Sequence, residues 1–210
     1  MRALVIAGGQ APSPALVRRY AGGAGLIVCA DRGYLAAQAA GVVPDVVVGD
    51  FDSMERPQLE GVQVQCLPVM KDMTDTQAAV DLCIERGARE VVLLGASGTR
   101  LDHTLANLLL LVRLENRGAR GLLVDAHNRV RAVRGTVALD LAEGTLFSLL
   151  PLGAGVTVGI SGAVYPLEQG FPLTLDNPLG VSNVARGGRV TLELAGGWAL
   201  LILATDAPQD

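Results

Sequence analysis

The first 127 residues alternate short apolar runs with segments of helical period, and this alternation restricts the fold more than any other feature of the chain. Runs rich in Val, Ile and Leu predict strands buried on both faces. Strands that alternate with helices form a parallel sheet covered by helices. The predicted strands are residues 3–9, 25–31, 45–50, 90–96 and 121–126, and the predicted helices are residues 13–21, 32–40, 75–86 and 102–117.

The helical period ends near Asn128. Beyond it lie short strand-like runs separated by Gly, Pro, Asp and Asn, such as RVTLEL (189–194) and WALLILA (198–204). Closely spaced short strands of this kind predict a small antiparallel β-sandwich. The expected fold class is therefore α/β: a Rossmann-like parallel sheet with flanking helices in residues 1–127, followed by a β-sandwich domain in residues 128–210.

The charge of the chain argues against nucleic acid as a partner. The 210 residues carry a formal net charge of −4, whereas non-specific binding to nucleic acid calls for a basic face. An acidic protein binds phosphate through local devices instead, such as helix N-termini, a few Arg or Lys side chains, or metal ions.

The longest uncharged stretch, residues 144–167, does not read as a membrane span. It contains Pro151 and Pro166 and alternates with period two, which fits strands better than a continuous apolar helix. The first residues offer too short an apolar run for a secretory signal. We therefore expect a soluble cytoplasmic protein with no membrane partner, in which Cys29, Cys66 and Cys83 are buried free thiols.

The segment VVVGDFDS (46–53) places two aspartates one residue apart after a predicted buried strand. In extended chain Asp50 and Asp52 would point the same way, and two like charges 4 Å apart repel by about 4 kcal/mol at an effective dielectric near 20. A cation between them would relieve this repulsion. Three alternatives remain at this point: a nucleophilic Asp of the haloacid dehalogenase type, the metal-binding DxD of nucleotide-sugar glycosyltransferases, and a surface turn.

A second cluster, KDMTDTQ (71–77), lies at a predicted strand-to-helix junction. Thr74 and Gln77 have the spacing of a capping box, and Asp75 would lie in the first helical turn, where the helix dipole favours a carboxylate. Asp72 and Asp75 could serve only as caps. Alternatively, Lys71 reaches a phosphate while Asp75 joins Asp50 and Asp52 around Mg²⁺, which prefers oxygen ligands.

A third cluster, GASGTRLDHTLAN (95–107), follows the predicted strand 90–96. Its small residues would let backbone N–H groups approach an anion at the start of the next helix, although the Walker A pattern is absent. Arg100 offers a planar fork suited to phosphate. Asp102 could instead be the N-cap of the helix.

Taken together, these clusters resemble the thiamine pyrophosphokinase family. The matching segments, in family order, are ADRG (30–33), PD (44–45), GDFDS (49–53), KDMTDT (71–76), RLDHTLAN (100–107) and SN (182–183). The resemblance spans nearly the whole chain and includes the change from α/β to all-β. It is most specific in the first half.

The resemblance implies an enzyme that transfers diphosphate from ATP to the hydroxyl of thiamine and releases AMP. It implies Asp50, Asp52 and Asp75 as ligands of Mg²⁺, and Lys71 and Arg100 as phosphate contacts. Further residues implied around the nucleotide and thiamine are Asp31, Asp72 and Asp102 in the first domain and Ser182 and Asn183 in the second. A homodimer that builds its site across the interface is also implied.

Phosphoryl-type transfer requires mainly positioning and charge neutralisation from the protein, which agrees with this set of charged residues. Either Asp31 or Asp75 could accept the proton of the alcohol. Two other functions keep parts of the same pattern: a sister pyrophosphokinase acting on another heterocyclic alcohol such as a pterin, and a non-catalytic sensor of nucleotide or thiamine.

Overall fold

The computed structural model describes all residues except 50–61, 67–71, 178 and 209–210. The chain divides into two compact units, Met1–Ala126 and His127–Pro208. The fold as a whole is mixed α/β. No helix within the described ranges is long and apolar enough to cross a membrane.

The first unit contains a parallel sheet, as the alternating pattern predicts. Its described strands pair in the order β6-β5-β1-β2-β3-β4, and every pairing among them is parallel. The strands are β1 (Arg2–Ile6), β2 (Leu26–Ala30), β3 (Val46–Gly49), β4 (Gln63–Cys66), β5 (Glu90–Leu94) and β6 (Arg120–Val124). The helices are α1 (Pro14–Ala21), α2 (Gly33–Ala39), α3 (Asp75–Glu85) and α4 (Leu101–Asn116).

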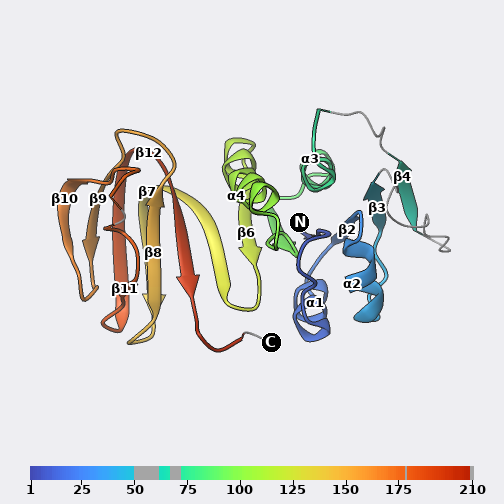
Figure 1. Cartoon of the computed structure of the whole chain (residues 1–210), viewed down its shortest axis with the longest axis horizontal. Helices are drawn as coiled ribbons and strands as arrows, with labels where there is room; N and C mark the ends of the chain where they lie inside the picture. The colour runs from blue at the N-terminus through green and yellow to red at the C-terminus, as the bar shows by residue number, and fades with distance from the viewer. Residues whose placement is uncertain (50–61, 67–71, 178, 209–210) are drawn as a thin grey trace. The chain divides into compact units, whose positions relative to one another are not determined.

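The helices of this unit cover both faces of the sheet (Figure 1). Helices α1 and α2 pack on the face that carries Leu4 and Ile6 of the central strand β1, and α3 and α4 lie on the other. Helix α4 approaches β6 closely, because a Cβ added at Gly121 would lie 2.9 Å from side-chain atoms of both Leu111 and Leu114. The second half of α4 therefore packs closely against β6.

The second unit is antiparallel. Its strands are β7 (Asn128–Leu141), β8 (Leu146–Pro151), β9 (Thr157–Ser161), β10 (Leu167–Pro172), β11 (Asn183–Val184) and β12 (Gly188–Ala204). Strand β12 pairs with β7 along most of its length, with β9 through Thr191–Ala195 and with β8 through Ala199–Ala204. Apolar side chains of these strands, including Phe147, Leu149, Val158 and Leu192, form a separate core.

The runs RVTLEL and WALLILA belong to one strand, β12, rather than to two. The pairing of β12 with β7 shifts register between Leu194 and Ala199, and Gly196 adopts a φ of 79° within this interval. A glycine in the left-handed region accommodates a bulge without steric cost. The glycines between the two runs therefore form a bulge within one strand and do not end it.

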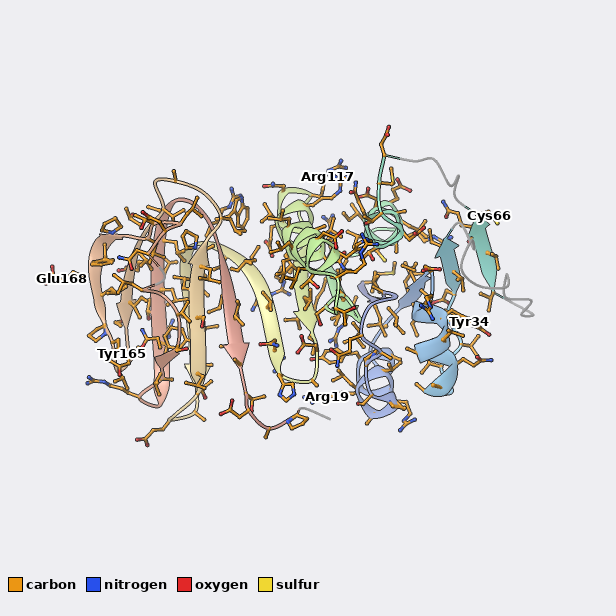
Figure 2. All side chains as sticks on the ribbon, in the orientation of Figure 1. Arg19, Tyr34, Cys66, Arg117, Tyr165 and Glu168 are labelled. Carbon is orange, nitrogen blue, oxygen red and sulfur yellow. The ribbon has the colours of Figure 1, made fainter. Side chains whose placement is uncertain are left out.

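The three cysteines differ in exposure. Cys29 and Cys83 are buried, and burial raises the pKa of both thiols to about 12. Cys66 is exposed on β4 (Figure 2). The expectation of three buried thiols is therefore wrong for Cys66, because β4 is a short strand at the edge of the described sheet whose side chains face solvent in part.

Candidate functional site

Polar residues of the first unit follow its parallel strands at one edge of the sheet. Gly8 follows β1, Asp31 follows β2, Ser97 follows β5 and Asp125 follows β6. Parallel strands end at a common edge, and ligands of open α/β sheets bind there. This edge is the candidate site.

The loops after β1, β5 and β6 are bonded directly to one another. The Gly9 N–H donates to Gly95 O at 2.8 Å, and the Gln10 N–H donates to Ser97 O at 2.7 Å. The Ser97 hydroxyl donates to Asp125 Oδ2 at 3.0 Å. Any side chain at Gly9 would clash, since its Cβ would lie 2.4 Å from Ser97 O. The three loops thus form one fixed polar surface.

Asp31 follows β2 directly and has an unusual backbone conformation. Its φ is 48°, in the left-handed region that Asp tolerates better than most residues and that is often found at functional sites. Its N–H donates to Val48 O at 2.8 Å, which ties the residue to β3. Its Oδ2 lies 3.5 Å from the position of a Cβ built on Gly8. The carboxylate therefore faces the loop after β1.

Helix α3 begins at the next predicted cluster. The Thr74 hydroxyl accepts a hydrogen bond from the Gln77 N–H at 3.1 Å, which confirms Thr74 as the N-cap. Asp75 lies half-buried in the first turn, whereas Asp72 is exposed. The helix ends as predicted with Gly87 at a φ of 82°. The sequence therefore places a carboxylate at the positive end of this helix dipole.

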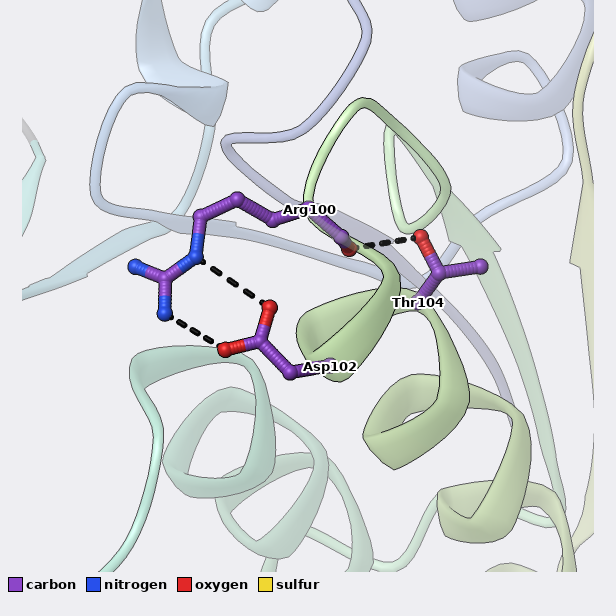
Figure 3. Close-up of polar contacts among 3 residues, drawn as sticks. All are labelled: Arg100, Asp102 and Thr104. Atoms are coloured by element: carbon purple, nitrogen blue, oxygen red, sulfur yellow. Dashed lines mark hydrogen bonds and ion pairs between the residues drawn. The ribbon is translucent and has the colours of Figure 1, made fainter.

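Arg100 and Asp102 form a bidentate ion pair at the start of α4 (Figure 3). Hydrogen bonding to Arg100 is the main reason why the pKa of Asp102 falls to about 2. The N-cap is Arg100, so the alternative that made Asp102 the N-cap is wrong. Helix α4 starts two residues earlier than that alternative requires, and Asp102 lies within its first turn, where its side chain bonds to the guanidinium of Arg100.

Two side chains of α4 that had no assigned role hold the loop between β5 and α4. Asn107 is buried and donates from Nδ2 to Ala96 O at 2.8 Å. The Thr104 hydroxyl accepts from the Gly98 N–H at 3.2 Å. The only signal for Thr104 in the sequence is a hydroxyl four residues beyond Arg100, a spacing that commonly produces nothing more than a bond within the helix.

Several predicted site residues lie outside the described part of the chain. These are Asp50, Asp52 and Lys71. Within the part that is described, no three His, Cys, Asp or Glu side chains are grouped so that they could hold a metal ion. The predicted metal ligand among the described residues is Asp75. The set of three Mg²⁺ ligands stays a prediction.

In the second unit, Ser182 and Asn183 have different environments. Ser182 is exposed, has a φ of 58° and donates its N–H to Ser148 Oγ at 3.0 Å. Asn183 is buried, and its side chain bonds to backbone groups of the Tyr165 segment. Its Nδ2 donates to Tyr165 O at 2.8 Å, and its Oδ1 accepts from the N–H groups of Tyr165 and Val184. Asn183 thus fixes a loop next to the exposed Ser182.

The sequence is similar to that of known proteins over most of its length. Residues 17–123 match the family model described as thiamin pyrophosphokinase, catalytic domain. The chain is 28% identical to thiamine pyrophosphokinase of Bacillus subtilis over 184 residues, covering 84% of this chain and 86% of that protein. It is 31% identical to thiamin pyrophosphokinase 1 of Caenorhabditis elegans over 162 residues, covering 71% of this chain and 66% of that protein.

The fold is similar to that of solved structures over almost its full length. The crystal structure of thiamine pyrophosphokinase from Bacillus subtilis superposes with a TM-score of 0.86 at 25% identity, covering 98% of this chain and 100% of the other. That of thiamin pyrophosphokinase from Geobacillus thermodenitrificans superposes with a TM-score of 0.82 at 26% identity, covering 98% of each chain.

Proposed function

Because the chain belongs to the thiamin pyrophosphokinase family, we propose that it transfers the terminal diphosphate of ATP to the hydroxyl of thiamine, giving thiamine diphosphate and AMP. It is thus an ATP-dependent diphosphotransferase. The observation that carries this proposal is that the matched segment, residues 17–123, contains the loops after β2 and β5 and the start of α4, where Asp31, Ser97 and Arg100 lie.

The reaction requires the thiamine hydroxyl oxygen to attack the β-phosphorus of ATP while the bond from that phosphorus to the AMP oxygen breaks. The proton of the alcohol leaves to a base, and Asp31 and Asp75 are the two carboxylates proposed for it. The protein otherwise contributes position and charge. Arg100 and Lys71 would bind phosphate oxygens, Asp102 orients Arg100, and Asp72 lies beside the nucleotide.

We propose Asp50, Asp52 and Asp75 as the residues that hold Mg²⁺. Their carboxylate oxygens are the donor type that this ion prefers. When bound to the polyphosphate, the ion supplies neutralisation of the charge that develops during transfer. The position of Asp75 in the first turn of α3 supports this choice, because a helix that follows a strand of a parallel sheet begins at the edge where that strand ends.

The two units are proposed to divide the substrates between them. Residues 1–127, a Rossmann-like domain, bind ATP, and residues 128–210, a β-sandwich, bind thiamine and form the dimer contact. The exposed Ser182, held in a left-handed conformation beside the loop fixed by Asn183, supports a thiamine contact in the second domain. The enzyme is proposed to be a cytoplasmic homodimer.

The identity of the nucleotide that the reaction releases tests this proposal. Purified protein is incubated with ATP, magnesium and thiamine, and the nucleotides and thiamine esters are separated by chromatography. Equal amounts of AMP and thiamine diphosphate are expected. ADP with thiamine monophosphate would contradict diphosphate transfer, turnover only with a pterin alcohol would identify the sister enzyme, and thiamine binding without AMP would identify a sensor.

A further inference from the structure

Thr104 connects the first turn of α4 to the loop that precedes it (Figure 3). Its hydroxyl donates to Arg100 O at 3.1 Å and accepts from the Gly98 N–H at 3.2 Å. The Thr104 N–H donates to the same Arg100 carbonyl at 3.0 Å. One side chain therefore bonds to the backbone on both sides of Thr99.

A threonine hydroxyl that bonds back to the carbonyl four residues earlier is common in helices and by itself has only local effect. The bond from Gly98 is different, because Gly98 lies before the helix, in the loop after β5. Gly98 also lies against the loop after β1: a Cβ added there would lie 3.1 Å from Gln10 N. The loop is thus confined between the β1 loop and the Thr104 hydroxyl.

Arg100 is held at two points as a result. Thr104 fixes its backbone carbonyl, and Asp102 holds its guanidinium through Nε and Nη2. The side chain of Arg100 makes no capping hydrogen bond, and the Thr104 hydroxyl joins the Gly98–Arg100 segment to the helix, beside the bond from Asn107 to Ala96. If the Thr104 hydroxyl is removed, the Gly98 N–H loses this partner and the Arg100 carbonyl keeps the bond from the Thr104 N–H, so the loop before Arg100 is held less firmly while the ion pair remains.

We propose that Thr104 is a positioning residue for nucleotide binding: its hydroxyl fixes the Gly98–Arg100 loop so that the Arg100 fork meets the phosphates of ATP. This inference rests on the proposed role of Arg100 as a phosphate contact. Thr104 acts through the loop and does not itself contact the nucleotide.

Thr104→Val, which keeps the shape of the side chain, is the test variant, and Thr104→Ser, which keeps the hydroxyl, is its matched control. Thr104→Val is expected to raise the KM for ATP about 5-fold, the scale of one ordinary hydrogen bond, and to leave the KM for thiamine within about 2-fold. Thr104→Ser should restore the KM for ATP. Equal KM values for ATP in Thr104→Val and wild type would overturn the proposal, whatever happens to the melting temperature.

A double-mutant cycle with Arg100→Ala separates positioning from general weakening of the fold. If Thr104 acts through Arg100, adding Thr104→Val to Arg100→Ala changes the KM for ATP by less than about 2-fold. A full additional 5-fold increase in the double variant would show that Thr104 acts independently of Arg100 and would overturn the proposal.

A binding measurement on the same variants distinguishes failure of the Thr104 proposal from failure of the proposed reaction. Calorimetric titration with a non-hydrolysable ATP analogue in magnesium needs no turnover and no thiamine. The positioning role predicts that Thr104→Val weakens binding of the analogue, that Thr104→Ser binds it as the wild type does, and that Thr104→Val has no further effect in the Arg100→Ala background. This pattern supports the positioning role even if the wild type forms no AMP. Unchanged affinity in Thr104→Val contradicts it.

Discussion

Arg100 and Asp102 form a side-on ion pair in which Nε meets Oδ1 at 3.2 Å and Nη2 meets Oδ2 at 2.6 Å. Both side chains are largely exposed, at 70% and 65%. An exposed pair adds little to stability. Its consequence is geometric, because Asp102 holds one edge of the guanidinium and Nη1 remains directed away from the carboxylate (Figure 3).

This pair predicts an abnormal titration of Asp102. Its pKa, lowered to about 2 by the hydrogen bond from Arg100, should return toward 3.8 in Arg100→Gln. Carboxyl chemical shifts followed by NMR measure both values. Asp176 is a matched control, because a hydrogen bond from Thr174 lowers its pKa and does not depend on Arg100. A low pKa of Asp102 that persists in Arg100→Gln would contradict the assigned cause.

The lowered pKa of Asp102 determines the pH range in which its ion pair with Arg100 can stabilise the fold. Since the folded-state pKa lies below the unfolded value, any stabilisation by the pair is fully present above about pH 4 and is lost as the pH falls through 2. We therefore expect the ion pair to be intact across neutral pH. The pH profile of kcat between pH 6 and 9 should be the same in shape for wild type and Asp102→Asn, and a new ionisation in that range would argue against the prediction.

Gly33 is predicted to be intolerant of any side chain. A Cβ at this position would lie 1.9 Å from Ile6 O, where the start of α2 touches the end of β1. Gly33→Ala must displace backbone, so we expect it to lower the free energy of unfolding by at least about 3 kcal/mol, the upper end for overpacking. Denaturant unfolding provides the measurement.

The control for this substitution is Gly25→Ala. Its Cβ would meet ordinary contacts no closer than 3.6 Å, and its φ does not favour glycine. Its cost should stay below about 1 kcal/mol. Equal costs at both positions would contradict the steric account of Gly33.

Arg113 and Asp81 join the two helices that begin at the candidate site. The guanidinium of Arg113 on α4 donates to both carboxylate oxygens of Asp81 on α3, at 2.7 and 2.9 Å, and both side chains are partly buried. A double-mutant cycle with Arg113→Gln and Asp81→Asn should give a coupling free energy of about 1 kcal/mol in unfolding. A coupling near zero would mean that the pair does not fasten α3 to α4.

We predict that Asn183 mainly stabilises the fold of the second unit and affects thiamine binding through that role. Asn183→Ala leaves the part-buried backbone groups of Tyr165 and Val184 without their side-chain partner, which is expected to cost about 1 kcal/mol or more in total. We expect a fall in melting temperature together with a higher KM for thiamine. Ser182→Ala should change the KM for thiamine without the loss of stability, and the reverse pattern would contradict these assignments.

The parallel sheet was predictable because its strands carry a strong local signal. VVVG and EVVLL are short runs rich in β-branched and aliphatic residues that favour a strand buried on both faces. The N-cap Thr74 and the C-terminal Gly87 mark α3 in the sequence itself. Strand β4 was missed because QVQC is short and half polar. Its pairing with β3 depends on a neighbour that no local pattern reveals.

The site was predictable only in its residue types. The charges of Arg100 and Asp102 indicated phosphate chemistry, but their mutual ion pair depends on where α4 begins. Likewise, the burial of Asn183 depends on the segment around Tyr165, and the role of Thr104 depends on the path of the loop at Gly98. Such contacts arise from tertiary structure, which the spacing of residues does not determine.

We propose that carboxylates from separate loops hold one divalent ion on the polyphosphate of ATP. The most direct test of this proposal is kcat for AMP formation in Asp50→Asn and Asp75→Asn at saturating magnesium, ATP and thiamine. We predict that each substitution lowers kcat at least about 100-fold, the scale of losing a key electrostatic element. Turnover close to that of the wild type in either variant would contradict the claim.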